Sequence, residues 1–399
     1  MYAQGTSSLE YPVKNLRVKL KGKNFTVKPD IAPVELVTFK ADFMESSGSH
    51  NTGASNYIDT LYEYVGMKTP GQEHFESGEN RIVTCIKGHP CVIFWNPGID
   101  ENGNILDKND PKNYTYIGKY NFNLDKATPE PFGFMNDEND EKFGYEVDEN
   151  GELVLVDGKK VNSIHCFEFL DNNEKVCNFE SDSESKYIGF NVNDPSDKVY
   201  ELNNKTEQER YEDTWYSLRK NEEGDIVPGW ARGFESRYPE LDDDEITPEA
   251  ADSLRGFAEW LNNLYTMRYI DGNEDAVRIF RKEYRQYLDT DFLLAYYIIT
   301  EALLMADSRV KNMMIATWGK EHRSWKDDDG EEHNTFDYVW YPIFYDMDTM
   351  LGLDNIGYVN KHYYDEDTVE DVYNGDEILW KFVRDALPNE LARFYTRAE

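Results

Sequence analysis

The sequence predicts an α+β fold, with a β-rich first part followed by a mainly helical second part. In the first part, apolar and basic residues alternate along Leu16–Leu20, which is the period of a half-buried strand. In the second part the period changes, and apolar residues recur at the spacing of one helix face between Leu254 and Leu264. We therefore divide the chain into residues 1–165 and residues 166–399.

Length and charge limit the classes of protein to which this chain can belong. The chain has 399 residues, enough to bury a hydrophobic core, and its 14% of aromatic residues argues against disorder. Its net charge of −36 argues against binding nucleic acid or an anionic membrane, since both need clustered Lys and Arg. No run of about 18 apolar residues is present, so we expect no membrane-spanning helix.

Two further features indicate where the chain works. The N-terminal residues Met1–Gly5 contain neither a basic region nor an apolar stretch, so we expect no signal peptide. The four cysteines form no C-x-x-C pair, which disfavours a zinc site. We expect reduced thiols in an intracellular setting.

Along the first part, the pattern predicts strands around one helix. A run rich in β-formers, Val34–Phe43, follows the strand at Leu16–Leu20. A helix is expected from Gly48 to Gly66, with the second glycine as its stop signal. Further strands are expected over Arg81–Ile86 and Cys91–Trp95, separated by a turn.

Two acidic segments interrupt the first part, Asp100–Asn104 and Asp148–Glu152. Both resemble calcium-binding loops at first sight. In each, however, glycine stands at the fourth position and an aliphatic residue at the sixth, where a calcium loop needs its glycine. We therefore expect Asn-Gly hairpin tips between short strands.

The second part predicts three helices and a strand. Thr247-Pro248 caps the first helix, and Val277–Leu288 forms the second. The third begins at Thr290 or Asp291 and is apolar almost all round through Met305, which indicates a buried helix. A strand is expected over Tyr338–Tyr345.

The buried helix leads into the first pair of residues with catalytic character. Asp307 and Asn312 stand at the D-x-x-x-x-N interval of a kinase catalytic loop. At this spacing a carboxylate accepts the proton of an attacking hydroxyl, while an amide oxygen one turn further holds a metal ion against nucleotide phosphates.

The second such pair follows the strand that ends at Tyr345. Asp346 and Asp348 stand two residues apart where an apolar strand reaches the surface, and a carboxylate there is costly unless it is paired or binds metal. A D-x-D pair also suits a glycosyltransferase, although that function leaves Asp307 and Asn312 unexplained. A solvated strand end or a helix cap is the structural alternative.

With these two pairs in kinase order, the sequence resembles the CotH-type kinases, an atypical family with the protein-kinase-like fold. The opening segment Gln4–Ser8 with Tyr11–Asn15 is similar to the G-x-S-S…P-K-K start of that family. Asp42–Ser47 is similar to its strand-to-helix element, and Tyr345–Asp348 is similar to its W-D-x-D metal segment. Tyr116–Asn123 and Phe234–Pro239 resemble CotH-like domains of large bacteriophage structural proteins.

The resemblance implies a two-lobed fold and an ATP-dependent transfer of phosphate to a protein hydroxyl. Asp307 would be the catalytic base, and Asn312, Asp346 and Asp348 would bind Mg²⁺ or Mn²⁺. The phosphate-holding lysine would be either Lys14 or Lys40, the latter on a strand just before a helix. The candidate phosphate-binding residues of the opening segment are Gly5, Ser7 and Ser8.

The sequence also departs from the kinase pattern. It has no GxGxxG, VAIK or HRD motif, and Tyr345 replaces the tryptophan of the CotH metal segment. Glu63 is a candidate partner for the lysine, with an ordinary exposed glutamate as the alternative. The charged stretch Gly319–Asn334 is expected to be a hairpin tip, and as an insertion it could gate the site.

The alternative function is that of a bacteriophage virion component that keeps the kinase-like fold as architecture. In that case the partners are other virion proteins rather than a protein acceptor of phosphate. Either function places the chain in the cytoplasm of an infected bacterium or in a virion. The abrupt start and end of the resemblance suggest a segment of a longer polypeptide.

Overall fold

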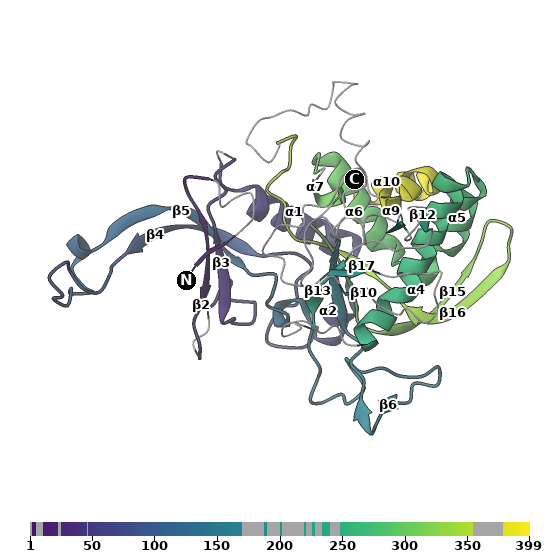
Figure 1. The fold of residues 1–399 in the computed structure, drawn as a ribbon, viewed down its shortest axis with the longest axis horizontal. Helices are drawn as coiled ribbons and strands as arrows, with labels where there is room; N and C mark the ends of the chain where they lie inside the picture. The colour runs from purple at the N-terminus through teal and green to yellow at the C-terminus, as the bar shows by residue number, and fades with distance from the viewer. Residues whose placement is uncertain are drawn as a thin grey trace.

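The computed structural model describes residues 2–4, 11–22, 25–45, 47–169, 187–189, 200–201, 219–220, 226–227, 234–239, 248–305, 307–310, 312–353 and 378–399. Its architecture is α+β, as the sequence predicts: antiparallel sheets form the first part and the centre, and most of the long helices come from the second part (Figure 1).

The first sheet is antiparallel and has five strands in the order β1-β2-β3-β5-β4. These strands are β1 (Tyr2–Gln4), β2 (Asn15–Lys19), β3 (Leu36–Lys40), β4 (Gly88–Trp95) and β5 (Thr115–Leu124). Because β3 lies between β2 and β5, the end of β3 at Lys40 is held from both sides.

The strand expected over Arg81–Ile86 does not form, and β4 begins at Gly88, inside the expected turn. Isolated hydrogen bonds hold this segment instead: the Arg81 amide donates to the Asp30 carbonyl (2.6 Å) and the Val83 amide to the Pro131 carbonyl (2.8 Å). Ile82, Val83, Cys85 and Ile86 are buried. Cys85 makes only an isolated parallel bridge to Phe344, so the apolar run reflects burial in the core rather than a continuous strand.

Helix α1 (His50–Val65) confirms the helix expected between Gly48 and Gly66. Gly66 ends it with a φ of +74°, a left-handed conformation that glycine adopts without steric cost. Ala54 and Ile58 on its inner face are fully buried.

The second sheet has six strands in the order β10-β9-β13-β8-β14-β17. These strands are β8 (His165–Phe169), β9 (Tyr187–Gly189), β10 (Tyr200–Glu201), β13 (Phe234–Tyr238), β14 (Met313–Thr317) and β17 (Tyr341–Phe344). The expected division after residue 165 falls at the start of β8. The strand expected over Tyr338–Tyr345 is divided: Tyr338 ends β16, Trp340 makes an isolated bridge to Leu288, and β17 covers Tyr341–Phe344.

The longer helices of the second part lie on one side of this sheet (Figure 1). They are α4 (Pro248–Tyr265), which continues into the π-helix η4 (Thr266–Ile270), α5 (Asp275–Tyr287), α6 (Thr290–Ala302), α9 (Ile378–Ala386) and α10 (Pro388–Ala398). The three predicted helices thus correspond to α4, α5 and α6. α6 is buried on almost every side, as its continuous apolar sequence predicts.

Short elements connect these layers. They are α2 (Pro70–His74), the 3₁₀ turns η2 (Pro111–Asn113) and η3 (Glu130–Phe132), α7 (Asp307–Val310), and the hairpins β6 (Leu155–Val156)–β7 (Lys159–Lys160), β11 (Arg219–Lys220)–β12 (Ile226–Val227) and β15 (Lys320–Lys326)–β16 (Glu332–Tyr338).

The acidic loops are hairpin-type turns, as expected, and they share one hydrogen-bond pattern. Asp100 Oδ1 accepts from the amides of Asn102 (2.9 Å) and Asn104 (2.8 Å). Asp148 Oδ1 accepts from the amides two and four residues later at 2.8 and 2.9 Å. Asp327, at the tip of β15–β16, repeats this at 3.0 and 2.8 Å. The aspartates therefore stabilise turns.

The described cysteines Cys85, Cys91 and Cys166 are free, as expected. Cys177 lies outside the described residues.

A stack of aromatic rings joins the helices to β17. The ring of Tyr296 in α6 lies 4.1 Å from that of Phe344 in β17 and 5.0 Å from that of Trp380 in α9, centroid to centroid. All three residues are buried in one hydrophobic core that also includes residues of α1 and β3. The packing fixes the end of β17 relative to the rest of the molecule.

We predict that Trp380→Ala destabilises the protein by about 3–5 kcal/mol, because it removes a fully buried ring and leaves a cavity. The change is measured from the urea midpoint of unfolding followed by circular dichroism. Tyr395→Ala is the control, because this ring on α10 is 57% exposed and its loss is expected to cost about 0.5 kcal/mol or less. Equal losses in the two variants would contradict the role of the stack.

Candidate functional site

The centre of the candidate site is an ion pair between two distant parts of the chain. Lys40 ends β3, and Asp346 follows β17 two residues after its end. The Lys40 Nζ donates to Asp346 Oδ2 at 2.9 Å across a sequence separation of 306 residues. The two side chains are 14% and 17% exposed. The pair joins the first sheet to the second.

The electrostatic surroundings keep Lys40 charged. Burial by itself lowers the pKa of a lysine, since it disfavours the charged form. The negative charges of Asp346 and Asp348 outweigh this effect and raise the pKa of Lys40 well above its usual value. Lys40 is therefore positively charged at neutral pH, beside the two carboxylates.

The N-terminus of α1 holds the Asp346–Asp348 segment from a second side. Asn51 Oδ1 accepts from the Met347 amide at 2.9 Å. His50 Nδ1 donates to the Asp348 carbonyl at 2.9 Å. Hydrogen bonds to main-chain groups fix the path of the segment, so the two aspartate side chains keep a defined direction.

The loop between α6 and β14 holds the same segment from a third side. The Ser308 hydroxyl donates to the Asp346 carbonyl at 3.2 Å, and the Tyr296 hydroxyl donates to the Ser308 carbonyl at 2.7 Å. Arg309 is buried and donates to Tyr297 O at 2.9 Å. α7, which begins at Asp307, is therefore fixed beside Asp346.

Asn312 is brought to the site by strand pairing. Met313 of β14 pairs with Phe344 of β17, so the preceding Asn312 lies opposite Tyr345, next to Asp346. Its φ of +57° is in the left-handed region, which asparagine tolerates better than most residues. The structure thus brings together the segments of Asp307, Asn312 and Asp346. The side chain of Asp307 lies outside the described part of the structure.

The residues present fit a divalent cation such as Mg²⁺ or Mn²⁺. Asp346 uses one oxygen to accept from Lys40, whereas its Oδ1 is buried and has no hydrogen-bond partner. A buried oxygen without a donor is unfavourable unless a cation satisfies it. Carboxylate and amide oxygens are the ligands that Mg²⁺ prefers, and residues of these types, Asp346, Asp348 and Asn312, stand in the two segments that meet here.

A small cavity adjoins the ion pair. It is lined by Thr38, Lys40, Asn51, Ile86, Asn123, Leu124, Asp125, Lys126 and Tyr345. The Lys126 ammonium lies 4.6 Å from the centre of the Tyr345 ring and 3.0 Å from Glu168. Asn123 Oδ1 is buried without a hydrogen-bond partner. The cavity therefore has two lysines and an unsatisfied amide oxygen in its wall.

Sequence reasoning missed Lys126 as a site residue. The only sequence feature that marks Lys126 is its position directly after the end of β5, in Leu124-Asp125-Lys126. The neighbouring Asp125 is buried and accepts from Arg17 (2.8 Å) and Thr38 (2.6 Å), which fixes this turn against β2 and β3. No local pattern indicates that Lys126 and Lys40 line one cavity.

Other predicted residues have different positions. Lys14 precedes β2, and the structure pairs Lys40 with Asp346. Gly5, Ser7 and Ser8 lie outside the described residues. Glu63 is exposed near the end of α1 opposite to Asn51, which agrees with the alternative of an ordinary exposed glutamate rather than a partner of the lysine.

The charged hairpin β15–β16 forms as expected, and the tip of the hairpin contacts α5 rather than the candidate site. Arg281 and Lys282 of α5 bond Asp328 and Glu331 at its tip. Asp327, Glu331 and His333 stand close enough to hold a metal ion. However, the Lys282 Nζ already lies 3.2 Å from Asp327 and 2.5 Å from Glu331, so a lysine neutralises this cluster.

No model of a known protein family matches this sequence, and no curated protein is significantly similar to it. Among the described helices, none combines the length and the apolar character needed to cross a bilayer. The function is therefore inferred from the site itself.

Two carboxylates in the connection between β3 and α1, Asp42 and Glu45, have pKa values shifted in opposite directions. Asp42 is buried, has a φ of +43° and accepts from the Asn121 amide; burial raises its pKa. Glu45 accepts from the amides of Gly48 (2.7 Å) and His50 (2.9 Å). Burial opposes the shift, but these hydrogen bonds and that of Ser47 lower the pKa of Glu45.

We predict opposite effects for the two neutral variants. Because the pKa of Asp42 is raised, the folded state binds the Asp42 proton more tightly than the unfolded state does. Protonation of Asp42 therefore stabilises the fold at low pH, and this stabilisation is lost as the pH rises through the raised pKa. Asp42→Asn is therefore expected to be more stable than the wild type at pH 7. Asparagine also suits the positive φ.

Glu45→Gln is expected to be less stable by about 1–2 kcal/mol at pH 7, because it loses charge-assisted bonds to the helix N-terminus. The deficit shrinks below about pH 4, where the wild-type glutamate also gains a proton. Thermal unfolding between pH 3 and 8 measures both effects. A lower stability of Asp42→Asn at pH 7 would show that the ionised Asp42 stabilises the fold.

Proposed function

We propose that this chain is a metal- and ATP-dependent phosphotransferase of the CotH-like kinase type, acting on a protein hydroxyl. The observation that carries the proposal is the 2.9 Å pair between Lys40, at the end of a strand, and Asp346, in the D-x-D segment. A nucleotide-binding kinase needs a strand lysine and a metal-binding aspartate at one place. Because the two residues are 306 positions apart in the sequence, a coincidental contact is a weak explanation of this ion pair.

The proposed two-lobed arrangement follows from the same pair. The five-stranded sheet with α1 corresponds to the small lobe, and the six-stranded sheet with α4 to α10 corresponds to the large lobe. Lys40 belongs to the first and Asp346 to the second, so the site lies at the junction between the lobes, where kinases bind nucleotide.

Each residue then has a chemical role. Lys40 binds phosphate oxygens, and Asp346, Asp348 and Asn312 hold Mg²⁺ or Mn²⁺, which neutralises charge on the phosphates. Asp307 accepts the proton as the acceptor oxygen bonds to the γ-phosphorus and the bond to ADP breaks. Because the chain carries a charge of −36, cations at this place are needed to admit a polyanionic nucleotide.

Lys126 supports the proposal as a second cation in the wall of the cavity. It is held beside the Tyr345 ring, and it shares Glu168 with Arg237. Burial opposes the shift, but the charges of Arg237 and Lys126 lower the pKa of Glu168, so this carboxylate stays ionised and anchors both cations. The cavity itself is small and is also lined by Asp125, so the two lysines would act on a phosphate oxygen that reaches the ion pair rather than on a ligand enclosed in the cavity.

A second candidate function, that of a virion component, is favoured by one observation. Strands β4 and β5 project as a long arm beyond the first sheet (Figure 1). Large apolar side chains on this arm are exposed: Val92, Phe94, Trp95, Ile99, Ile105, Tyr116 and Ile117. Clustered exposed apolar residues mark protein interaction surfaces, and within the described ranges β4 is an edge strand of its sheet.

For the kinase proposal, we predict that ATP with Mg²⁺ raises the melting temperature by about 1–3 °C at saturating concentration, and that EDTA removes the shift. Lys40→Met and Asp346→Asn are expected to lose it. Lys19→Met, at an exposed position on β2, is the control. Asp307→Asn is expected to keep the shift and to lower phosphate transfer at least about hundredfold.

No shift with millimolar ATP would overturn the kinase proposal. If Asp307→Asn transferred phosphate at the wild-type rate, only the assignment of Asp307 as the catalytic base would be wrong.

For the virion proposal, we predict that the wild-type chain self-associates at its highest soluble concentration, measured by analytical ultracentrifugation. Replacing both Phe94 and Tyr116 with serine is expected to give monomers, because it removes paired rings from the exposed arm. Val156→Ser, at an exposed position on β6, should leave association unchanged. A wild-type chain that stays monomeric would speak against the arm as a contact between copies.

A further inference from the structure

A buried thiol and a buried ammonium group meet against the inner side of α1. The side chains belong to Cys85 and Lys87, and both residues are 0% exposed. The Lys87 Nζ donates to the Cys85 Sγ at 3.0 Å. Neither the sequence motifs nor the proposed kinase chemistry uses these two residues, although a lysine is rarely buried so completely.

Helix α1 fixes the nitrogen beside the sulfur. Lys87 also donates to the carbonyl (2.8 Å) and the hydroxyl (2.9 Å) of Ser55, and it forms an ion pair with Asp59 at 2.6 Å. The Cys85 thiol lies 3.6 Å from the same Ser55 carbonyl. Reacting atoms in a near-attack arrangement are about 3–3.5 Å apart. The contact between nitrogen and sulfur therefore already has the separation that bond formation requires.

Asp59 allows Lys87 to lose its positive charge at this place. Its Oδ2 accepts from Lys87 and also from Arg81, at 2.9 Å. If Lys87 becomes neutral, Asp59 keeps Arg81 as its counter-charge, so no buried charge is left unpaired. The Asp59 side chain is 21% exposed, so it can take the proton of the ammonium group and pass it to solvent.

The segment that carries the thiol is held by few backbone bonds. Residues 81–86 form no strand in the described structure, and isolated hydrogen bonds such as that from the Val83 amide to the Pro131 carbonyl (2.8 Å) hold them. Among the described residues, the buried Thr84 hydroxyl has no hydrogen-bond partner. Segments with few such bonds open locally at low free energy. A small neutral oxidant such as hydrogen peroxide can therefore reach the Cys85 sulfur.

We propose that hydrogen peroxide links Cys85 to Lys87 through a reversible sulfenamide, a covalent bond between sulfur and nitrogen. First, the sulfur attacks one peroxide oxygen, the O–O bond breaks, and the thiol becomes a sulfenic acid as one water leaves. Asp59 then takes a proton from the ammonium group. The Lys87 amine attacks the sulfur, the S–O bond breaks, and a second water leaves, as when a backbone nitrogen forms a sulfenamide. Two molecules of a thiol reductant restore thiol and amine and become a disulfide.

The proposed link lies directly behind the candidate site. Ile86, between the two linked residues, lines the cavity that contains Lys40. Cys85 makes an isolated bridge to Phe344, two residues before Asp346. An S–N bond is shorter than the present contact, so its formation draws the lysine away from α1. Control of nucleotide binding by the link rests on the proposed function, whereas the link itself does not.

The test treats the folded full chain with millimolar hydrogen peroxide, alkylates the remaining thiols and digests the chain with trypsin for mass spectrometry. Trypsin cleaves after lysine and arginine, so the unmodified chain gives the peptide Ile82–Lys87. A lysine linked through its nitrogen resists trypsin. We therefore expect the peptide Ile82–Lys108 instead, two hydrogens lighter than its sequence after allowance for alkylation, and we expect dithiothreitol given before alkylation to restore Ile82–Lys87.

Internal and variant controls isolate the role of the lysine. Cys166 is buried as completely as Cys85, and burial raises the pKa of its thiol, so it should oxidise at least about tenfold more slowly. Lys87→Gln keeps a donor for Ser55 but has no amine, so Cys85 should proceed to a sulfinic acid that dithiothreitol does not reverse. Lys68→Gln, at an exposed position, should link like the wild type.

Three results would overturn the proposal. Cys85 could remain a thiol, or it could gain oxygen while Lys87 stays open to trypsin. It could also form a disulfide with Cys91, which leaves the lysine cleavable and joins two peptides. Peroxide treatment of the wild type in urea keeps the test decisive if Lys87→Gln does not fold: the folded chain should form the link at least about tenfold faster, and equal rates would contradict the role of the folded geometry.

Discussion

A carboxylate at the end of a buried strand is the constraint on which the rest of this structure depends. Asp346 follows β17 and is largely removed from water, where an unpaired negative charge is strongly unfavourable. Lys40 supplies the opposite charge from the first sheet. The first sheet must therefore be placed so that Lys40, at the end of β3, reaches Asp346 just after β17.

The segment from Asp346 to Asp348 is held by its backbone as well as by its charges. Asn51, His50 and Ser308 bond main-chain groups of its three residues, and they come from α1 and α7. Behind it, the stack of Phe344, Tyr296 and Trp380 fixes the strand that leads into it. Electrostatics thus decides which side chains meet, and packing decides where they meet.

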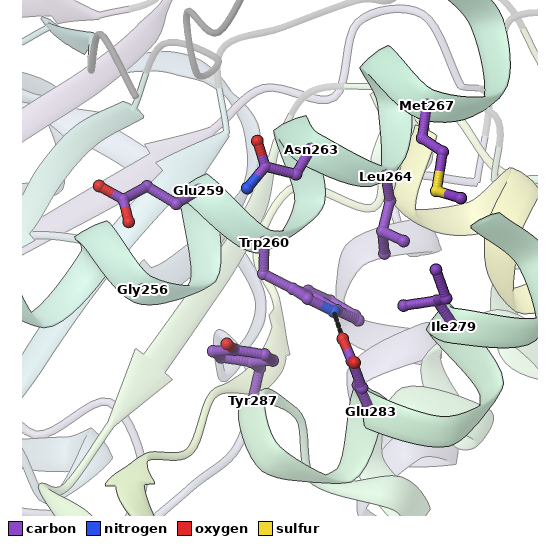
Figure 2. Close-up of a pocket in the computed structure, with 9 residues that line it drawn as sticks. All are labelled: Gly256, Glu259, Trp260, Asn263, Leu264, Met267, Ile279, Glu283 and Tyr287. Carbon is purple, nitrogen blue, oxygen red and sulfur yellow. Dashed lines mark hydrogen bonds between the residues drawn. The ribbon is translucent and has the colours of Figure 1, made fainter. Parts of the chain in front are cut away.

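The acidic side chains of this strongly negative chain are stabilised in different ways at different places. At hairpin tips, Asp100 and Asp148 accept backbone amides, and at β15–β16 lysine and arginine of α5 neutralise the acidic tip. Between α4 and α5, the Trp260 indole donates to Glu283 and holds this carboxylate in place (Figure 2).

The sequence by itself determined the α+β order, the helices α1, α4, α5 and α6, the hairpin tips and the spacing of Asp307, Asn312 and Asp346. These features depend on local patterns: the period of apolar residues, glycine at a helix end, and aspartate at a turn. Only the tertiary structure decided that Lys40 meets Asp346, that Lys126 shares its cavity, that Glu63 faces solvent and that Arg81–Ile86 is not a strand. The physical reason is that charge pairing and burial depend on neighbours hundreds of residues away, and a local period cannot distinguish a buried loop from a buried strand.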